Sequence, residues 1–321
     1  MRKLIFILFL ISNLLSAQNY FFNDHKVVKS ITNIESKEYY DAAQLQFDVF
    51  DSKRNKLYSI KKNVEYDIPH PGVAVFENGS VVLINSFDAS LEYYNIVGQK
   101  IKTINLFSDR EVTYERSIYF DAVGDMIVVL VSQPEYEKSE VIVLDNNGEK
   151  LNNWQFEAKN ASGVKISEDL NIIAVSGFNW FHNLVEVTSF YSAGGNLSFS
   201  LPFKFTKAKF YDENFAGITN KSIHLVDLKK GKLIWKKDAA ENKLFGDVNI
   251  GGNIFQLVET DKPILDKGKW VYSKLILKIF DKTGNKVDEA LIYNTPFENI
   301  SITGKNNSIK IFADDIVVYS K

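Results

Sequence analysis

The sequence of 321 residues contains no cysteine and only four histidines. Without cysteine the chain forms no disulfide, so its stability must come from burial of apolar surface. The histidines form no His-x-His or His-x-x-x-His pair, so we predict neither a zinc nor a copper site, and we expect no cofactor. A lipid anchor on a cysteine behind an export leader is excluded as well.

The chain also lacks long hydrophobic runs and concentrated charge of one sign. The longest apolar run, Leu4 to Ile11, is shorter than the roughly 20 residues that span a bilayer, so no transmembrane segment is predicted. The net charge is −2, and no run of Lys or Arg is dense enough to track a phosphate backbone. Nucleic acid is therefore not an expected partner. No Gly-x-Ser-x-Gly nucleophile motif is present.

The first seventeen residues have the layout of a secretory signal peptide. Arg2 and Lys3 precede the apolar run, and the small residues Ser16 and Ala17 end the segment. We predict a signal peptide at residues 1–17, cleavage after Ala17, and an exported protein, periplasmic or secreted, with one domain at residues 18–321. The abundance of Asn, Lys, Ile and Phe, together with this leader, resembles exported proteins of the Bacteroidetes.

One hairpin pattern recurs along the rest of the chain. It consists of an apolar run, an Asp or similar turn residue, two or three polar residues, a Gly and a second strand-like run, and it occurs around Gly148, Gly231 and Gly284. A second class of hairpin, such as VAVFENGSVVLI at residues 73–84, alternates with it. Hairpins repeated every 40–50 residues or so are typical of a β-propeller.

The two hairpin classes fit the four antiparallel strands of a propeller blade, named A to D from the axis outward. Residues 126–131 are continuously apolar, as an inner strand requires, whereas residues 232–238 alternate with polar residues, as an outer edge does. We predict an all-β propeller of seven blades, each of about 43 residues. Six blades and an elaborated N-terminal segment are the alternative. The last blade lacks a fourth strand in the sequence, and residues 20–30 are expected to supply it.

A resemblance supports this architecture. The stretch LVDLKKGKLIWKKD resembles the repeat of PQQ-like propellers, in which an aliphatic residue and Asp are followed by Gly-Lys and then Trp. VLDNNGEKLNNW is a looser copy. The resemblance implies a WD40-like or PQQ-like propeller, and because these families include both redox enzymes and scaffolds it implies no particular activity.

Several polar or aromatic residues are expected to be structural. The turns DNNGEK and DKTGNK lack the alternating oxygen ligands of a calcium loop and are predicted to be tight turns. His224 lies within an apolar strand and is predicted to be a hydrogen-bonded packing residue. Trp235, on an outer strand, is predicted to pack between blades.

The candidate binding residues lie on loops. The B–C and D–A connections emerge on one face, and two B–C loops, at residues 177–183 and 260–273, are rich in aromatic residues. Aromatic residues on loops of a rigid scaffold often anchor a partner, although they also cap the ends of blades. The predicted binding residues are Phe178, Trp180 and His182 in the first loop, Trp270 and Tyr272 in the second, and His70, Arg110 and Arg116 in D–A loops.

These observations predict an exported, non-catalytic binding or scaffolding propeller that recognises a protein, peptide or glycan through one loop face. The alternative is an exported enzyme that processes a glycan or peptide in the axial funnel. That alternative requires at least two converging carboxylates with shifted pKa values. The sequence does not specify the oligomeric state.

Overall fold

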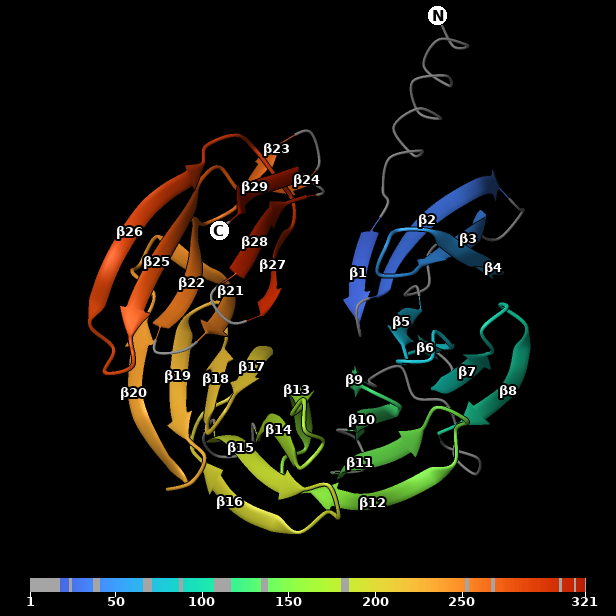
Figure 1. The fold of residues 1–321 in the computed structure, drawn as a ribbon, viewed down its shortest axis with the longest axis horizontal. Helices are drawn as coiled ribbons and strands as arrows, with labels where there is room; N and C mark the ends of the chain where they lie inside the picture. Colours follow the sequence, from blue (N-terminus) through green and yellow to red (C-terminus); the bar gives the residue numbers. More distant parts are fainter. Residues whose placement is uncertain are drawn as a thin grey trace, which may run out of the picture. The chain divides into compact units, whose positions relative to one another are not determined.

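The protein is an all-β, seven-bladed β-propeller (Figure 1). The computed structural model describes residues 18–22, 25–36, 41–65, 71–86, 89–106, 117–133, 138–179, 185–251, 254–266, 269–305, 308–314 and 316–320. All the regular secondary structure in these ranges is β-strand. None of the described residues belongs to a helix that could cross a membrane. The predicted fold class and the seven blades are confirmed, and the six-bladed alternative is wrong.

The chain divides into two compact units, Met1–Gln155 and Phe156–Lys321. The first unit holds blades one to three, each a four-stranded antiparallel sheet. Their strands are β1 (Gln18–Phe22), β2 (His25–Ser36), β3 (Asp41–Phe50) and β4 (Lys56–Glu65); β5 (Gly72–Val75), β6 (Val81–Asn85), β7 (Ser90–Tyr94) and β8 (Lys100–Asn105); and β9 (Ser117–Val123), β10 (Met126–Gln133), β11 (Lys138–Asp145) and β12 (Lys150–Phe156).

The second unit holds blades four to seven. Blades four and five consist of β13 (Asn160–Ile166), β14 (Ile172–Asn179), β15 (Val185–Ser192) and β16 (Leu197–Leu201), then β17 (Lys207–Tyr211), β18 (Asn214–Ile218), β19 (Ser222–Asp227) and β20 (Lys232–Asp238). Blade six consists of β21 (Lys243–Gly251), β22 (Ile254–Asp261), β25 (Leu275–Asp281) and β26 (Lys286–Tyr293), with an extra hairpin, β23 (Ile264–Asp266) and β24 (Lys269–Val271), between its second and third strands. Blade seven consists of β27 (Ile300–Lys305), β28 (Ser308–Ala313) and β29 (Ile316–Ser320).

Burial follows the order of the strands within a blade. In β10 the side chains from Ile127 to Val131 are at most 1% exposed, because neighbouring blades cover both faces of an inner strand. In β20 most side chains are exposed, and Trp235 is one of the two that are partly buried. The predicted grading from apolar inner strands to half-exposed outer strands is therefore present in these two blades.

The first two strands belong to blade one and do not complete the last blade, as residues 20–30 were expected to do. β1 pairs with β2, and β2 pairs with β3. Val27 is fully buried in one cluster with Leu45 and Phe47 of β3. A slip of one residue would turn Val27 away from this cluster, so its burial fixes the register of β2 against β3. Blade seven shows three strands in the part of the chain that the structure describes.

The recurring glycines join neighbouring blades. At Gly231, in the C–D turn of blade five, an added Cβ would lie 3.1 Å from the Phe199 ring on the outer strand of blade four. The backbone there has a φ of +60°, which glycine adopts without strain. The same turn position faces an outer-strand side chain of the preceding blade in three other pairs: Gly98 and Tyr58, Gly148 and Ile104, and Gly284 and Trp235.

The Asp residues of these turns bond to the backbone. Asp145 Oδ1 accepts hydrogen bonds from the amides of Asn147 at 2.9 Å and Glu149 at 2.8 Å. Asp281 Oδ1 likewise accepts from the amides of Thr283 at 2.8 Å and Asn285 at 2.9 Å. Their oxygens therefore stabilise tight turns, as the sequence predicts.

Candidate functional site

The extra hairpin of blade six is the clearest candidate for a binding site. It lies in the B–C connection, within the long loop at residues 260–273 that the sequence analysis singles out. In this two-stranded sheet Leu265 pairs with Trp270, and Ile264 pairs with Val271. Cross-strand partners share a face and neighbours along a strand alternate, so Leu265 and Trp270 lie together on one side of the hairpin.

The β23–β24 hairpin exposes an unusual amount of apolar surface. Ile264 is 60% exposed, Leu265 is 61% exposed and Trp270 is 64% exposed. Single exposed apolar side chains are ordinary, but the adjacent Leu265 and Trp270 side chains have the composition found at the centres of protein interfaces.

Contacts at its base hold this hairpin in place. The Tyr272 amide donates to Phe297 O at 2.8 Å, the Phe297 amide donates to Tyr272 O at 3.1 Å, and the two rings stack with centroids 5.5 Å apart. Lys269 Nζ donates to Glu298 Oε1 at 2.7 Å. Because Lys269 and Trp270 alternate along β24, the Leu265–Trp270 side is the one turned away from this ion pair.

A further ion pair joins the beginning of the insertion to the sheet. Lys243 Nζ donates to Asp261 Oδ1, and the two groups form an ion pair that lowers the pKa of the Asp261 carboxyl. Ser273 Oγ is 3.4 Å from the other carboxylate oxygen, Oδ2. Both ends of the insertion are thus attached to blade six, which reduces the conformational entropy that binding would cost.

The structure places Phe178, from the other aromatic loop, at the end of β14 in blade four. Its ring is partly buried, and Lys204 Nζ lies 4.7 Å from the ring centroid. Lys204 also forms an ion pair with Glu186 at 3.0 Å. Phe178 belongs to blade four, whereas Trp270 and Tyr272 belong to blade six, so one whole blade lies between the two aromatic loops along the chain. Trp180, His182, His70, Arg110 and Arg116 lie outside the described residues, so their assignment stays a prediction.

Tyr272 and His224 have packing roles. Tyr272 is half-buried against Phe297, so it supports the hairpin more than it presents a surface. His224 is 5% exposed and stacks on Phe203 with centroids 4.4 Å apart. The predicted packing role of His224 is confirmed, but its Nδ1 has no hydrogen-bond partner among the described residues.

The carboxyl pKa shifts in the described residues go in one direction. Where a shift is present the pKa is lowered, as at Asp48, Asp51, Glu92, Asp169, Asp227, Asp261, Asp281 and Glu289. At Asp281 the Thr283 hydroxyl and Asn285 amide groups lower the pKa to about 2. A general acid for cleaving a glycan or peptide near neutral pH needs a raised pKa. These shifts therefore reflect turns and ion pairs.

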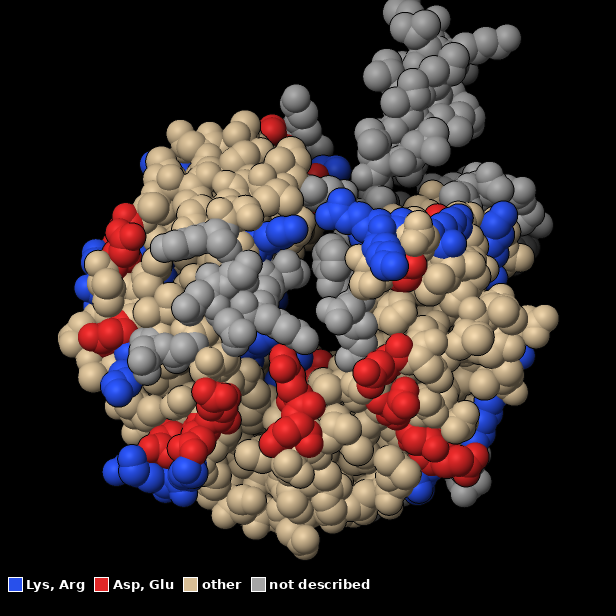
Figure 2. Space-filling model, viewed as in Figure 1, with Lys and Arg blue, Asp and Glu red and all other residues tan. Residues whose placement is uncertain are grey.

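The described residues contain no group of three or more His, Cys, Asp or Glu side chains placed to hold a metal ion. On the face seen in Figure 2, Lys and Arg side chains lie among Asp, Glu and uncharged residues.

A pocket that the sequence analysis missed lies in the second unit, at the opposite ends of the strands from the β23–β24 hairpin. The polar residues that line this pocket occur in hairpin turns, so in the sequence they indicate only turns.

Comparison with known proteins identifies the fold. No family model matches the chain, and no curated protein matches it. The structure of BamB from Moraxella catarrhalis is similar with a TM-score of 0.57 and 10% sequence identity, over 93% of this chain and 93% of that chain. The Dos1 propeller is similar with a TM-score of 0.59 and 9% identity, over 89% of this chain and 76% of that one. At these identities the similarity shows a shared propeller fold and no shared partner.

Proposed function

We propose that this protein is an exported, non-catalytic propeller that binds a protein partner through the β23–β24 hairpin. The observation that carries the proposal is the adjacent pair Leu265 and Trp270, each more than 60% exposed on a hairpin attached to blade six at both ends. Burying this pair in an apolar cleft of a partner would remove it from water, which is the main favourable term in association.

The chemistry of the hairpin favours a polypeptide over a glycan. A sugar-binding platform needs hydrogen-bonding side chains beside its aromatic ring, whereas the cross-strand partner on the Trp270 side of the hairpin is the apolar Leu265. The apolar pair fits a hydrophobic groove of a folded protein or an extended segment with apolar side chains.

Export is part of the proposal and rests on the leader at residues 1–17. Its test is the mass of the protein recovered from the exported fraction of the cell that naturally makes it. Cleavage after Ala17 would give a mature chain that begins at Gln18. Recovery of the full-length chain from the cytoplasm alone would contradict it.

Site-specific photo-crosslinking tests the binding site. A photoreactive residue replaces Leu265 in the full chain, in its natural cell, and the covalent adducts are identified by mass spectrometry. We expect one partner protein, and we expect Trp270→Ala to abolish its capture without lowering the melting temperature, because an exposed side chain contributes little to stability.

The matched control uses Val287 and Leu291 on the outer strand β26, which are 63% and 58% exposed. A photoreactive residue at Val287 should not capture the same protein, and Leu291→Ala should leave capture at Leu265 unchanged. Equal capture from both positions, or full capture by the Trp270→Ala variant, would refute the proposal. Selective binding to a glycan array that Trp270→Ala removes would replace the protein partner with a sugar.

A further inference from the structure

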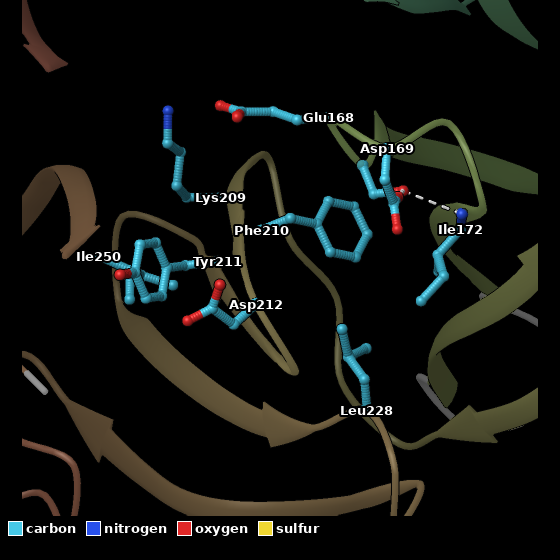
Figure 3. Close-up of a pocket in the computed structure, with 10 residues that line it drawn as sticks. Glu168, Asp169, Ile172, Lys209, Phe210, Tyr211, Asp212, Leu228 and Ile250 are labelled. Carbon is cyan, nitrogen blue, oxygen red and sulfur yellow. Dashed lines mark hydrogen bonds between the residues drawn. The ribbon is translucent and has the colours of Figure 1, made fainter. Parts of the chain in front are cut away.

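A pocket of about 360 Å³ lies in the second unit, where the A–B turns of blades four and five come close to β21 of blade six (Figure 3). This is the other end of the strands from the β23–β24 hairpin, so the pocket is independent of the proposed partner site. Its volume is near the lower end of the range for ligand sites, which is roughly 300–1,000 Å³. It therefore accommodates one long side chain or a small molecule.

The inner part of the pocket is apolar and aromatic. Phe210 is 8% exposed and Ile250 is 1% exposed, and Tyr211 and Leu228 are partly buried beside them. In Figure 3 the Phe210 ring lies between Asp169 and Tyr211. An aromatic and aliphatic lining favours an apolar stem, and the rings add attraction for a cation.

Carboxylates line the outer part. Asp169 is committed to its own turn, because its side chain accepts hydrogen bonds from Ser167 Oγ at 2.5 Å and from Asn171 Nδ2 at 2.9 Å. Glu168 and Asp212 differ: both are exposed, and the described residues provide neither carboxylate with a hydrogen bond or an ion pair. Among the described lining residues, Lys209 contributes the one ammonium and Glu168, Asp169 and Asp212 contribute three carboxylates, so this part of the lining is net negative.

This arrangement favours a cation carried on an apolar chain over a metal ion. The described residues contain no cluster of three or more metal-ligating side chains, and a divalent cation would need an oxygen cage where this pocket has Phe210 and Ile250. An ammonium or guanidinium group can reach Glu168 and Asp212 while its methylene stem packs on the aromatic lining.

We propose that this pocket binds the side chain of a lysine or arginine presented by a polypeptide. The stem lies along Phe210 and Leu228, and the charged end meets the Glu168 and Asp212 carboxylates. Because both carboxylates are solvent-exposed, the attraction is screened by salt, and binding weakens as ionic strength rises.

Titration calorimetry of the mature chain, residues 18–321, tests the proposal. The probes are acetyl-Gly-Arg-Gly-amide, the same peptide with lysine, and the same peptide with citrulline, which keeps the shape of arginine without its charge. We expect the charged peptides to bind at least tenfold more tightly than the citrulline peptide at low salt. We expect Glu168→Gln with Asp212→Asn to weaken their binding at least tenfold, and Lys209→Gln to strengthen it.

The substitutions preserve the fold at the site. Asp212 has a φ of +47°, a conformation that asparagine also tolerates, so Asp212→Asn keeps the turn. The matched control is Glu241→Gln with Asp266→Asn, which changes the net charge equally at exposed residues at the opposite strand ends. This control should leave peptide affinity unchanged.

Three results would overturn the proposal. The citrulline peptide could bind as tightly as the arginine peptide, or the control pair could weaken binding as much as the pocket pair. Tighter binding of the diamine putrescine than of either charged peptide would assign the pocket to a small free cation instead. None of these results depends on the β23–β24 hairpin, and Leu291→Ala, at an exposed residue of β26 outside both sites, serves throughout as a variant with unchanged peptide binding.

Discussion

The indole of Trp235 occupies the space that a side chain at Gly284 would need. An added Cβ at Gly284 would lie 3.0 Å from both Cδ1 and Cγ of the ring, and the backbone there has a φ of +87°. Trp235 is on the outer strand of blade five, and Gly284 is in the C–D turn of blade six. The indole also lies edge-on to Phe255, with centroids 5.6 Å apart. One side chain therefore joins two blades.

Gly284→Ala should lower the free energy of unfolding by about 2–4 kcal/mol, because the new methyl group faces both a left-handed backbone and the Trp235 ring. Urea denaturation of the purified chain measures this. Gly194→Ala is the control, since a Cβ at Gly194 meets only side-chain atoms at 3.7 Å and should change stability by no more than about 0.5 kcal/mol. Equal losses in the two variants would contradict the steric explanation.

Trp235→Ala should cost about 2–4 kcal/mol, because it removes the ring that packs on Phe255 and Phe280. In that background Gly284→Ala should cost less than in the wild-type chain, because the steric conflict is gone and only the backbone strain remains. A double-mutant cycle should therefore give a coupling of about 1–2 kcal/mol. Strict additivity would show that the two residues act separately.

Acid should destabilise the protein through His224. Burial, with a further effect of the nearby Lys236 ammonium, lowers the pKa of His224 to about 4 from 6.5. Between these values the unfolded chain takes up a proton that the folded chain does not, so stability is lost as the pH falls from about 6.5 to about 4. Between pH 7.5 and pH 4.5 the wild-type chain should lose about 2–3 kcal/mol more than His224→Phe. Parallel pH profiles of the two proteins would refute this.

Alkali should stabilise the folded protein relative to the unfolded chain through Lys29. This residue is 7% exposed, its Nζ donates to Pro71 O at 3.3 Å, and burial lowers its pKa to about 8 from 10.5. Below pH 8 the folded chain bears the cost of a buried charge, and that cost disappears as the pH rises toward 10.5.

Lys29→Met should therefore be more stable than wild type at pH 7, by about 1–2 kcal/mol after loss of the hydrogen bond. The stability difference should change by about 2 kcal/mol in favour of the wild type between pH 7 and pH 10, so the advantage disappears. Thermal unfolding at the two pH values measures both quantities. A variant less stable than wild type at pH 7 would show that Lys29 contributes more through its contacts than its burial costs.

Local chemistry made most of the fold predictable. Asp281 and Gly284 define their turn through hydrogen bonds and a backbone angle within a few residues, so the hairpin could be recognised without knowledge of its neighbours. The alternation of two hairpin classes then predicted the four-stranded blades and their number. The assignment of β1 and β2 failed because it depends on a contact distant in sequence, the burial of Val27 against Leu45 and Phe47, which no turn motif indicates.

The candidate sites were less predictable for the same reason. The aromatic loop at residues 260–273 was recognisable by composition, but strands as short as β23 and β24 carry too little periodicity to indicate a hairpin, so the pairing of Leu265 with Trp270 was not foreseen. The pocket was missed because Asp169 and Asp212 occur in ordinary turns. Only the fold brings those turns next to Phe210 and Ile250.

The contact between a turn glycine and the preceding outer strand has an evolutionary consequence. Within each unit, a middle blade both receives a glycine turn on its outer strand and offers one to the blade before it. A tandem duplication of one such segment would copy both halves of the contact, so the new copy would fit its neighbours without further mutation. Propellers built on this contact can thus change their number of repeats through single genetic events, while the loops at either end of the strands diverge independently.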